Sequence, residues 1–278
     1  MRLNNETWRE RKADEVTMKN KKIVLIGLCL SLVTCASSQK KLQQEKQKDP
    51  QYQYSMGAFY LNNNNLDEAI RFFQRALALD PRHFQSLNAL GLANSMKGNF
   101  AEAERSFLKC LEISPGFSEA RNNLGMVYQE MGFPDRAEAE FKKAVADATY
   151  ATKELPYYNL ARLYSLREDW ENALFYAEKA IQANIHYHLG YALKGYIMES
   201  QDKFVEAIEC YKEAVKTVPD DVSYNFHLAA AYFKNGEFRA AEEILERILP
   251  LITDPEMKQN ADSYLKTIRE KEKGMARG

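Results

Sequence analysis

The chain has few residues whose types and spacing could support catalysis or metal binding. Its four histidines are His83, His186, His188 and His227, of which His186-x-His188 forms a close pair. Neither a cysteine nor a convincing carboxylate partner lies near that pair, whereas a structural zinc ion requires four ligands. We interpret the pair as a surface feature at a helix start, and we expect no metal site and no cofactor.

Sequence motifs of common enzyme classes are also missing. The chain contains no glycine-rich phosphate loop, no nucleophile elbow and no CxxC pair. Its formal net charge is −1, and residues 1–34 hold seven Lys or Arg against four Asp or Glu, which leaves the remainder at −4. A nucleic-acid-binding protein would show a basic patch or stripe. We therefore predict a protein that is not an enzyme and that has neither a nucleic-acid partner nor a small-molecule substrate.

The elements that position the remaining side chains repeat along the chain. Small residues recur at spacings of 34, 34, 36, 34 and 34, at Gly57, Gly91, Gly125, Ala161, Gly195 and Ala229. Alanine follows twelve residues after each, at 69, 103, 137, 173, 207 and 241. Seven residues later stand Ala76, Cys110, Ala144, Ala180, Ala214 and Ile248. This period resembles that of tetratricopeptide (TPR) repeats, in which each unit is a pair of antiparallel helices.

Larger apolar residues and turn residues fall between these small positions. Rings recur on the first helix (Tyr60, Tyr128, Tyr164, Tyr232) and on the second (Phe73, Phe107, Phe141, Tyr211). Helix-ending residues separate the two helices at Asn62–Asn65, Gly98-Asn99, Gly132 and Gly236. The second helices are expected to start at Leu66, Phe100, Trp170, Phe204 and Phe238. The fold class predicted is all-α: a right-handed TPR superhelical solenoid of about six helix-turn-helix repeats plus a C-terminal capping helix.

The chain divides into five predicted segments. Residues 1–17 are charged and aperiodic, and we interpret them as a mis-annotated extension, with translation starting at Met18. Residues 18–34 are a signal peptide, because basic residues precede an apolar run of 11, Ile23–Val33. Residues 35–49 form a polar tether, and residues 50–253 form the six repeats. Residues 254–278 comprise the capping helix, expected over Glu256–Lys273, and a tail.

The end of the apolar run resembles a bacterial lipobox. Leu32 and Cys35 stand at the −3 and +1 positions, although Thr34 departs from the usual small residue at −1. We predict lipidation of Cys35 and an outer-membrane anchor on the periplasmic face. The alternative is ordinary secretion with cleavage near Ser37, which would give a soluble periplasmic protein. Cys110 and Cys210 lie in distant repeat units, which contact only their neighbours, so we expect them to be packing residues without a disulfide.

The predicted binding surface is the concave face, which first-helix side chains line. Counting from the packing glycines gives Tyr54, Ser55, Ala58, Asn88, Ala89, Leu92, Asn122, Asn123, Met126, Tyr158, Asn159, Arg162, Leu193, Tyr196, Phe226, His227 and Phe233. Asn123 and Asn159 hold the same position in consecutive units, and such amides can hydrogen-bond a peptide main chain. The alternative is that Asn122 and Asn123 stiffen contacts between helices. Cations are few on this face, which disfavours a ligand with a terminal carboxylate.

Signal, lipobox, tether and six repeats together resemble the TPR lipoproteins of type IV pilus biogenesis, the PilF/PilW/Tgl family. The run Ala120-Arg121-Asn122-Asn123-Leu124-Gly125 is similar to that family's asparagine pair before the packing glycine. The resemblance implies a pilotin, a lipoprotein that promotes outer-membrane localisation and multimerisation of the pilus secretin. A general TPR envelope scaffold, serving peptidoglycan hydrolases or outer-membrane assembly, is the alternative.

Overall fold

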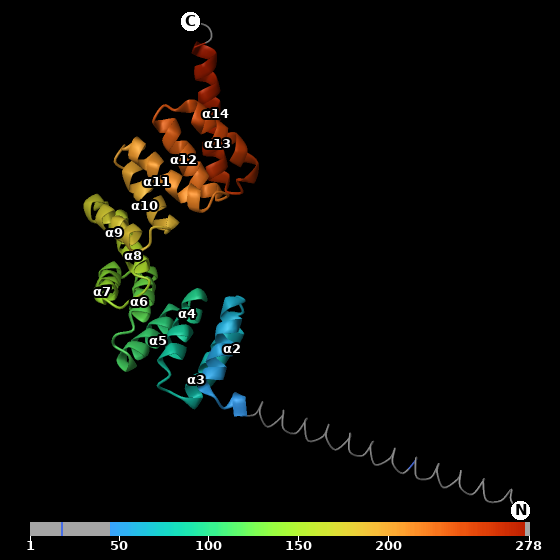
Figure 1. Ribbon diagram of the computed structural model, residues 1–278, viewed down its shortest axis with the longest axis vertical. Helices are drawn as coiled ribbons and strands as arrows, with labels where there is room; N and C mark the ends of the chain where they lie inside the picture. The colour runs from blue at the N-terminus through green and yellow to red at the C-terminus, as the bar shows by residue number, and fades with distance from the viewer. Residues whose placement is uncertain (1–17, 19–44, 276–278) are drawn as a thin grey trace, which may run out of the picture. The chain divides into compact units, whose positions relative to one another are not determined.

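The computed structural model describes Met18 and residues 45–275, and every element in residues 45–275 is helical (Figure 1). The chain forms two compact units, one ending at Lys97 and the other beginning at Gly98. The first contains α2 (Pro50–Asn62), α3 (Leu66–Leu79) and α4 (Phe84–Met96).

The second unit continues the same alternation of helices. It contains α5 (Phe100–Ile113), α6 (Ser118–Glu130), α7 (Pro134–Ala146), α8 (Glu154–Leu166), α9 (Trp170–Ala183), α10 (His188–Glu199), α11 (Phe204–Thr217), α12 (Val222–Lys234), α13 (Phe238–Ile248), the 3-10 turn η1 (Leu249–Leu251) and α14 (Pro255–Met275). Helices α2 and α3 pack as a pair, as do α6–α7, α8–α9, α10–α11 and α12–α13. The all-α fold and the five predicted starts of second helices are therefore confirmed.

The first helix of a unit needs a small residue because a ring of the second helix packs directly against its backbone. A Cβ added at Gly125 would lie 2.6 Å from Cε1 of Phe141, and one added at Gly195 would lie 2.7 Å from Cε1 of Tyr211. Such distances are too short for any carbon contact, so only glycine lets these fully packed rings approach the first helix. Each ring lies sixteen residues after its glycine. In the fourth unit the residue at that distance is Ala177, which has no ring, so alanine is tolerated at position 161.

The turns inside the units share one backbone requirement. A residue with positive φ recurs at Asn64, Gly98, Gly132, Glu168, Asp202 and Gly236, with φ between 56° and 84°. These positions follow the same 34- and 36-residue spacing as the packing positions. Glycine adopts this left-handed conformation without penalty, whereas Glu168 and Asp202 adopt it at a cost. The fourth and fifth turns therefore keep their shape although neither has a glycine at this position.

The last repeat is covered by α14. Phe226, Ala229 and Leu245 form a buried cluster with Ala261 and Leu265 of α14. Ile268 of the same helix is also fully buried, as the apolar face of this helix predicts. The helix runs from Pro255 to Met275, two residues beyond the predicted end.

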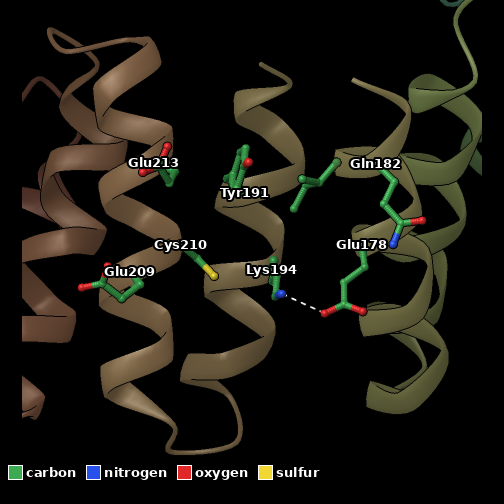
Figure 2. A pocket seen from close by; sticks show the side chains of 8 residues that line it. Glu178, Gln182, Tyr191, Lys194, Glu209, Cys210 and Glu213 are labelled. Atoms are coloured by element: carbon green, nitrogen blue, oxygen red, sulfur yellow. Dashed lines mark hydrogen bonds and ion pairs between the residues drawn. The ribbon is translucent and has the colours of Figure 1, made fainter. Parts of the chain in front are cut away.

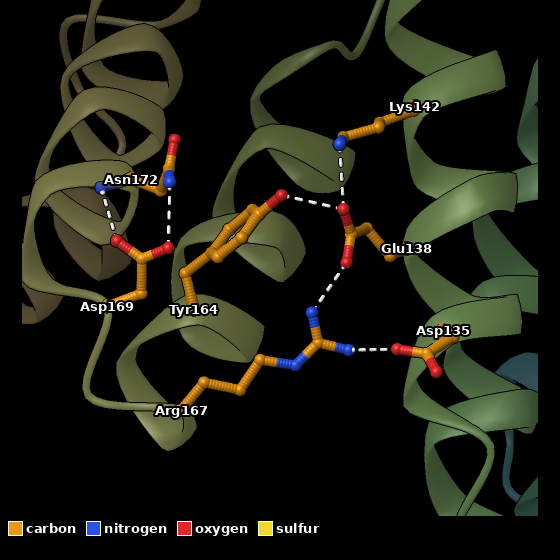
Figure 3. Close-up of polar contacts among 7 residues, drawn as sticks. All are labelled: Asp135, Glu138, Lys142, Tyr164, Arg167, Asp169 and Asn172. Atoms are coloured by element: carbon orange, nitrogen blue, oxygen red, sulfur yellow. Dashed lines mark hydrogen bonds and ion pairs between the residues drawn. The ribbon is translucent and has the colours of Figure 1, made fainter.

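A polar cluster fixes α8 against α7, as Figure 3 shows. Glu138 accepts hydrogen bonds from Lys142 at 2.7 Å, from the Tyr164 hydroxyl at 2.7 Å and from Arg167 at 2.6 Å. Burial alone would raise the pKa of Glu138, but these three donors outweigh it and lower the pKa to about 2. Arg167 also donates to Asp135 at 2.6 Å. The cluster therefore holds α8 in place beside α7 through a carboxylate that stays ionised at neutral pH.

Both described cysteines are buried and unpaired with each other. Cys110 is fully buried and Cys210 is 8% exposed, and no disulfide joins these two described cysteines. Burial raises the pKa of the Cys210 thiol to about 11, so that thiol is protonated at neutral pH. The predicted packing role of the two residues is confirmed.

Candidate functional site

A hollow of about 230 Å³ opens between the first helices of consecutive units in the second compact unit. We call it the aromatic hollow. It is lined by Tyr158 of α8, by Leu189, Ala192, Leu193 and Tyr196 of α10, by Tyr211 of α11, and by Ser223, Tyr224 and His227 of α12. The lining residues of α10 recur every three or four positions, so they share one face of that helix. The hollow thus lies where first-helix side chains were expected to form a binding surface.

Aromatic rings make up most of the wall. The rings of Tyr211 and His227 stack at a centroid distance of 5.6 Å and an angle of 19°. Tyr158 meets the ring of Tyr187 edge-on at 5.7 Å. Tyr196 is 47% exposed and contacts Trp170 edge-on at 6.4 Å. The exposed ring of Tyr196 therefore stands at the mouth, and the stacked pair forms the wall.

The lining of the hollow is uncharged at neutral pH. Burial raises the pKa of Tyr211, whose hydroxyl donates to Glu199 Oε2 at 2.8 Å. Burial lowers the pKa of His227, so its imidazole is neutral near pH 7. The charge of Glu199 is balanced by Lys234, whose Nζ donates to its other oxygen at 2.8 Å. Tyr224 is fixed by a 2.8 Å contact between its hydroxyl and Nδ1 of His188.

This arrangement suits recognition of an apolar or aromatic side chain. Small-molecule sites typically enclose 300–1,000 Å³, so the hollow is smaller than such a site. Rigid aromatic rings supply apolar contact area and can pack edge-on or stacked against an inserted ring. The hydroxyl groups of Tyr158, Tyr196 and Ser223 offer hydrogen bonds to a main chain.

Two of the asparagines predicted for the binding surface, Asn122 and Asn159, form a hydrogen bond to each other inside the protein. Asn159 Nδ2 donates to Asn122 Oδ1 at 2.9 Å, and both residues are buried, at 6% and 3% exposure. This bond joins α8 to α6 and corresponds to the helix-stiffening alternative for Asn122. Asn123 is half-buried, and Met126, three residues further, is 43% exposed. A contact between any of these residues and a partner stays a prediction.

The other predicted residues are distributed over several environments. Tyr158 and Tyr196 line the aromatic hollow, together with Leu193 and His227. Arg162 donates to Gln129 at 3.1 Å, and its Nε is buried without a partner among the described residues. Phe226 is 8% exposed and belongs to the core cluster beneath α14. In the first unit, Tyr54 packs against Phe73 and His83, and Asn88 is buried.

Five lining residues were not predicted for the binding surface: Leu189, Ala192, Tyr211, Ser223 and Tyr224. Leu189, Ser223 and Tyr224 each lie one helical turn before a predicted position, so the 3.6-residue period is a sequence signal that identifies these three. Ala192 directly precedes the predicted Leu193, and Tyr211 was predicted as a core ring of the second helix.

Three features remain: the predicted lipidation site, metal-binding clusters and membrane-spanning helices. Cys35 lies outside the described residues. Within the described residues, no cluster of three or more His, Cys, Asp or Glu side chains has the arrangement to hold a metal ion. A separate finding is that no described helix combines the length and apolarity needed to cross a membrane.

Three repeat-family models match the chain. The middle TPR-like domain of cilia and flagella-associated protein 70 matches residues 38–148, a tetratricopeptide repeat model matches 117–185, and a TPR repeat model matches 195–236. Surface lipoprotein assembly modifier 1 of Neisseria meningitidis serogroup B is 28% identical over 79 residues. Those residues are 28% of this chain and 16% of that relative, so the match spans about a sixth of the relative's length.

Solved structures show the same fold over most of the chain. PilW, described as a widely conserved type IV pilus biogenesis factor, aligns with a TM-score of 0.69 and 18% identity over 76% of this chain and 97% of PilW. PilF of Pseudomonas aeruginosa aligns with a TM-score of 0.71 and 16% identity over 79% of this chain and 99% of PilF. From the repeat models and the shared helical architecture we conclude that this chain is a tetratricopeptide-repeat protein.

Proposed function

We propose that the chain is a non-catalytic adaptor of the bacterial envelope that binds a partner polypeptide in the aromatic hollow. The observation that supports this most strongly is an uncharged, ring-lined hollow of about 230 Å³ on the first helices of a TPR fold. A partner segment would insert an apolar or aromatic side chain between Tyr158, Tyr196 and His227. Burial of one such side chain contributes about 1.5–3 kcal/mol, which is enough to select a particular segment.

The finer proposal is a pilotin-like role. The signal peptide, the lipobox at Cys35 and the polar tether support an anchored protein, and two structural neighbours are a pilus biogenesis factor and PilF. In this proposal the partner is the type IV pilus secretin. Attachment to the outer membrane raises the effective concentration of bound secretin subunits, so multimers form at that membrane.

A deletion strain tests the secretin role. We expect the strain to lose secretin multimers and surface pili, and complementation with the wild-type chain to restore both. The double variant Tyr158→Ala/Tyr196→Ala should fail to restore them. The matched control is Phe175→Ala, because Phe175 is 51% exposed but lies on the second helix α9, outside the hollow. Normal multimers and pili in the deletion strain would reject the pilotin role.

A second candidate is a scaffold for outer-membrane assembly, and the match to surface lipoprotein assembly modifier 1 favours it. This role predicts unchanged pili in the deletion strain but reduced display of surface lipoproteins. Surface protease accessibility of a lipoprotein, compared between the deletion and complemented strains, distinguishes the two roles.

The membrane anchor is tested separately, by mass spectrometry of the mature N-terminus. We propose that the mature protein begins at Cys35 with attached acyl chains and that translation begins at Met18. Cys35→Ser should release the protein from the membrane fraction. A mature protein cleaved near Ser37 would instead support the soluble alternative, and precursor peptides from residues 1–17 would exclude a start at Met18.

A further inference from the structure

Lysine 194 occupies a position that is apolar in all five other repeats. The residue directly before the packing glycine or alanine is Met56, Leu90, Leu124, Leu160 and Leu228 in those units. Leu124, Leu160 and Leu228 are buried, at 1%, 0% and 6% exposure. Lys194 therefore puts a charged, partly exposed side chain at a position that is buried and apolar in three of the other units.

A groove of about 450 Å³ lies over Lys194, between α9, α10 and α11 (Figure 2). A small side chain leaves it open, because Cys210 stands where the preceding unit has Tyr176. An adjoining hollow of about 490 Å³ shares Cys210 and Lys194 with the groove and continues past Met198. At 100° per residue, Tyr191, Lys194 and Met198 lie on the face of α10 opposite the aromatic hollow. The groove is thus a separate surface.

The groove combines an apolar floor with an acidic rim. Its lining contains the carboxylates Glu178, Glu206, Glu209 and Glu213 against the ammonium groups of Lys194 and Lys203. Glu209 and Glu213 also pair with Lys212 and Lys216 on the outer side of α11, at 3.0 and 3.2 Å. These are exposed pairs within one helix, which contribute little and exchange readily. The groove can therefore accept further positive charge.

Lys194 shows that the groove can hold a basic side chain. Its Nζ reaches across to Glu178 Oε1 at 2.8 Å, as Figure 2 shows, while its side chain lines the groove beside Cys210. Lysine and arginine bind in this way when their aliphatic stems cover apolar surface and their charged ends meet a carboxylate. A lysine or arginine of another molecule could contact the groove in the same way, with its stem on Cys210 and its charged end at Glu178.

We propose that this groove is a second docking site, for a basic amphipathic segment of a partner polypeptide. An apolar side chain of that segment covers Cys210 and Ile181, and its lysine or arginine joins Glu209 and Glu213 and competes with Lys194 for Glu178. This site does not depend on the aromatic hollow, so the adaptor can hold two segments at once.

Fluorescence anisotropy with the full mature chain tests the proposal directly. The probe is a fluorescein-labelled 14-residue helical peptide of Leu, Ala and Lys, and the control peptide has glutamate at every lysine. We expect the lysine peptide to bind and the glutamate peptide not to bind. Glu209→Gln/Glu213→Gln should weaken binding by about five-fold, as expected for two exposed ion pairs. Equal binding of the two peptides would overturn the proposal.

Two further variants separate docking from nonspecific attraction. Cys210→Tyr restores the ring of the preceding unit and should weaken binding by about ten-fold or more, because the floor is then covered. Its matched control, Cys210→Ala, should stay within about two-fold of wild type. Lys194→Met frees Glu178 and removes a competing cation, so affinity for the lysine peptide should rise by about five-fold.

Each variant is checked by circular dichroism before binding is measured. If Cys210→Tyr unfolds, Lys194→Met decides in its place, provided that its circular dichroism spectrum matches that of the wild type. Unchanged affinity in a folded Cys210→Tyr protein, or no gain in Lys194→Met, would contradict docking in this groove.

Discussion

The packing of a ring against a glycine can be tested by a double-mutant cycle at Gly125 and Phe141. Alanine at position 125 would place its Cβ 2.6 Å from the Phe141 ring, which is fully buried. Overpacking of this kind costs about 1–3 kcal/mol. The higher helix propensity of alanine offsets about 0.5–1 kcal/mol of that cost. We therefore expect Gly125→Ala to lower the free energy of unfolding by about 1 kcal/mol.

The same substitution should become favourable when the ring is removed. The sixth unit already combines Ala229 with Leu245, sixteen residues later, and Ala229 and Leu245 are both fully buried. In a Phe141→Leu background, Gly125→Ala should therefore raise stability by about 0.5 kcal/mol, through helix propensity alone. The expected coupling energy between the two sites is about 1.5 kcal/mol, within the range for residues in contact.

Urea unfolding of the four proteins, followed by ellipticity and by tryptophan fluorescence, measures this coupling. The single variant Phe141→Leu is the reference for the double variant. A change of sign for Gly125→Ala between the two backgrounds supports the packing argument. Equal effects in both backgrounds would refute it.

Three other predictions use the turns, the polar cluster and the hollow. Glu168→Gly should raise the free energy of unfolding by about 1 kcal/mol in urea titrations, because glycine removes the cost of the positive φ at that turn. Glu138 has a pKa lowered to about 2, so its contribution to stability is present above pH 4.5 and is lost as the pH falls from there through 2. Glu138→Gln should therefore lower stability at pH 7, by about 3 kcal/mol at most, and have little effect near pH 2 in thermal melts. Tyr158→Ala and Tyr196→Ala should each weaken capture of the partner polypeptide by about ten-fold in pull-downs while leaving the helical ellipticity unchanged.

The repeat architecture could be predicted because small residues repeat where helices approach closely. A Cβ added at Gly125 or Gly195 would lie under 3 Å from a ring, so glycine is required there and the repeat is visible in the sequence. Turn shape was less predictable. Glu168 adopts the same left-handed conformation as Gly132, and its residue type gives no signal of it. Asp202 does so too, although aspartate is only modestly favoured there.

The binding surface was predicted in part. Tyr158 and Tyr196 were found because the first-helix face follows from the repeat. Asn122 and Asn159 are on the same helices, but their mutual hydrogen bond depends on how consecutive units stack, which a count along one helix does not contain. Phe226 was placed on the concave face, yet α14 covers it together with the last repeat.

Site-specific photocrosslinking tests the central claim, that the aromatic hollow receives a partner polypeptide. A benzophenone amino acid is introduced at Tyr196, which is 47% exposed at the mouth of the hollow, and at Phe175, which is 51% exposed outside it, in cells that make the protein. We predict one specific crosslinked polypeptide from position 196 that is absent from position 175. No crosslink at position 196, or the same products from both positions, would contradict the claim.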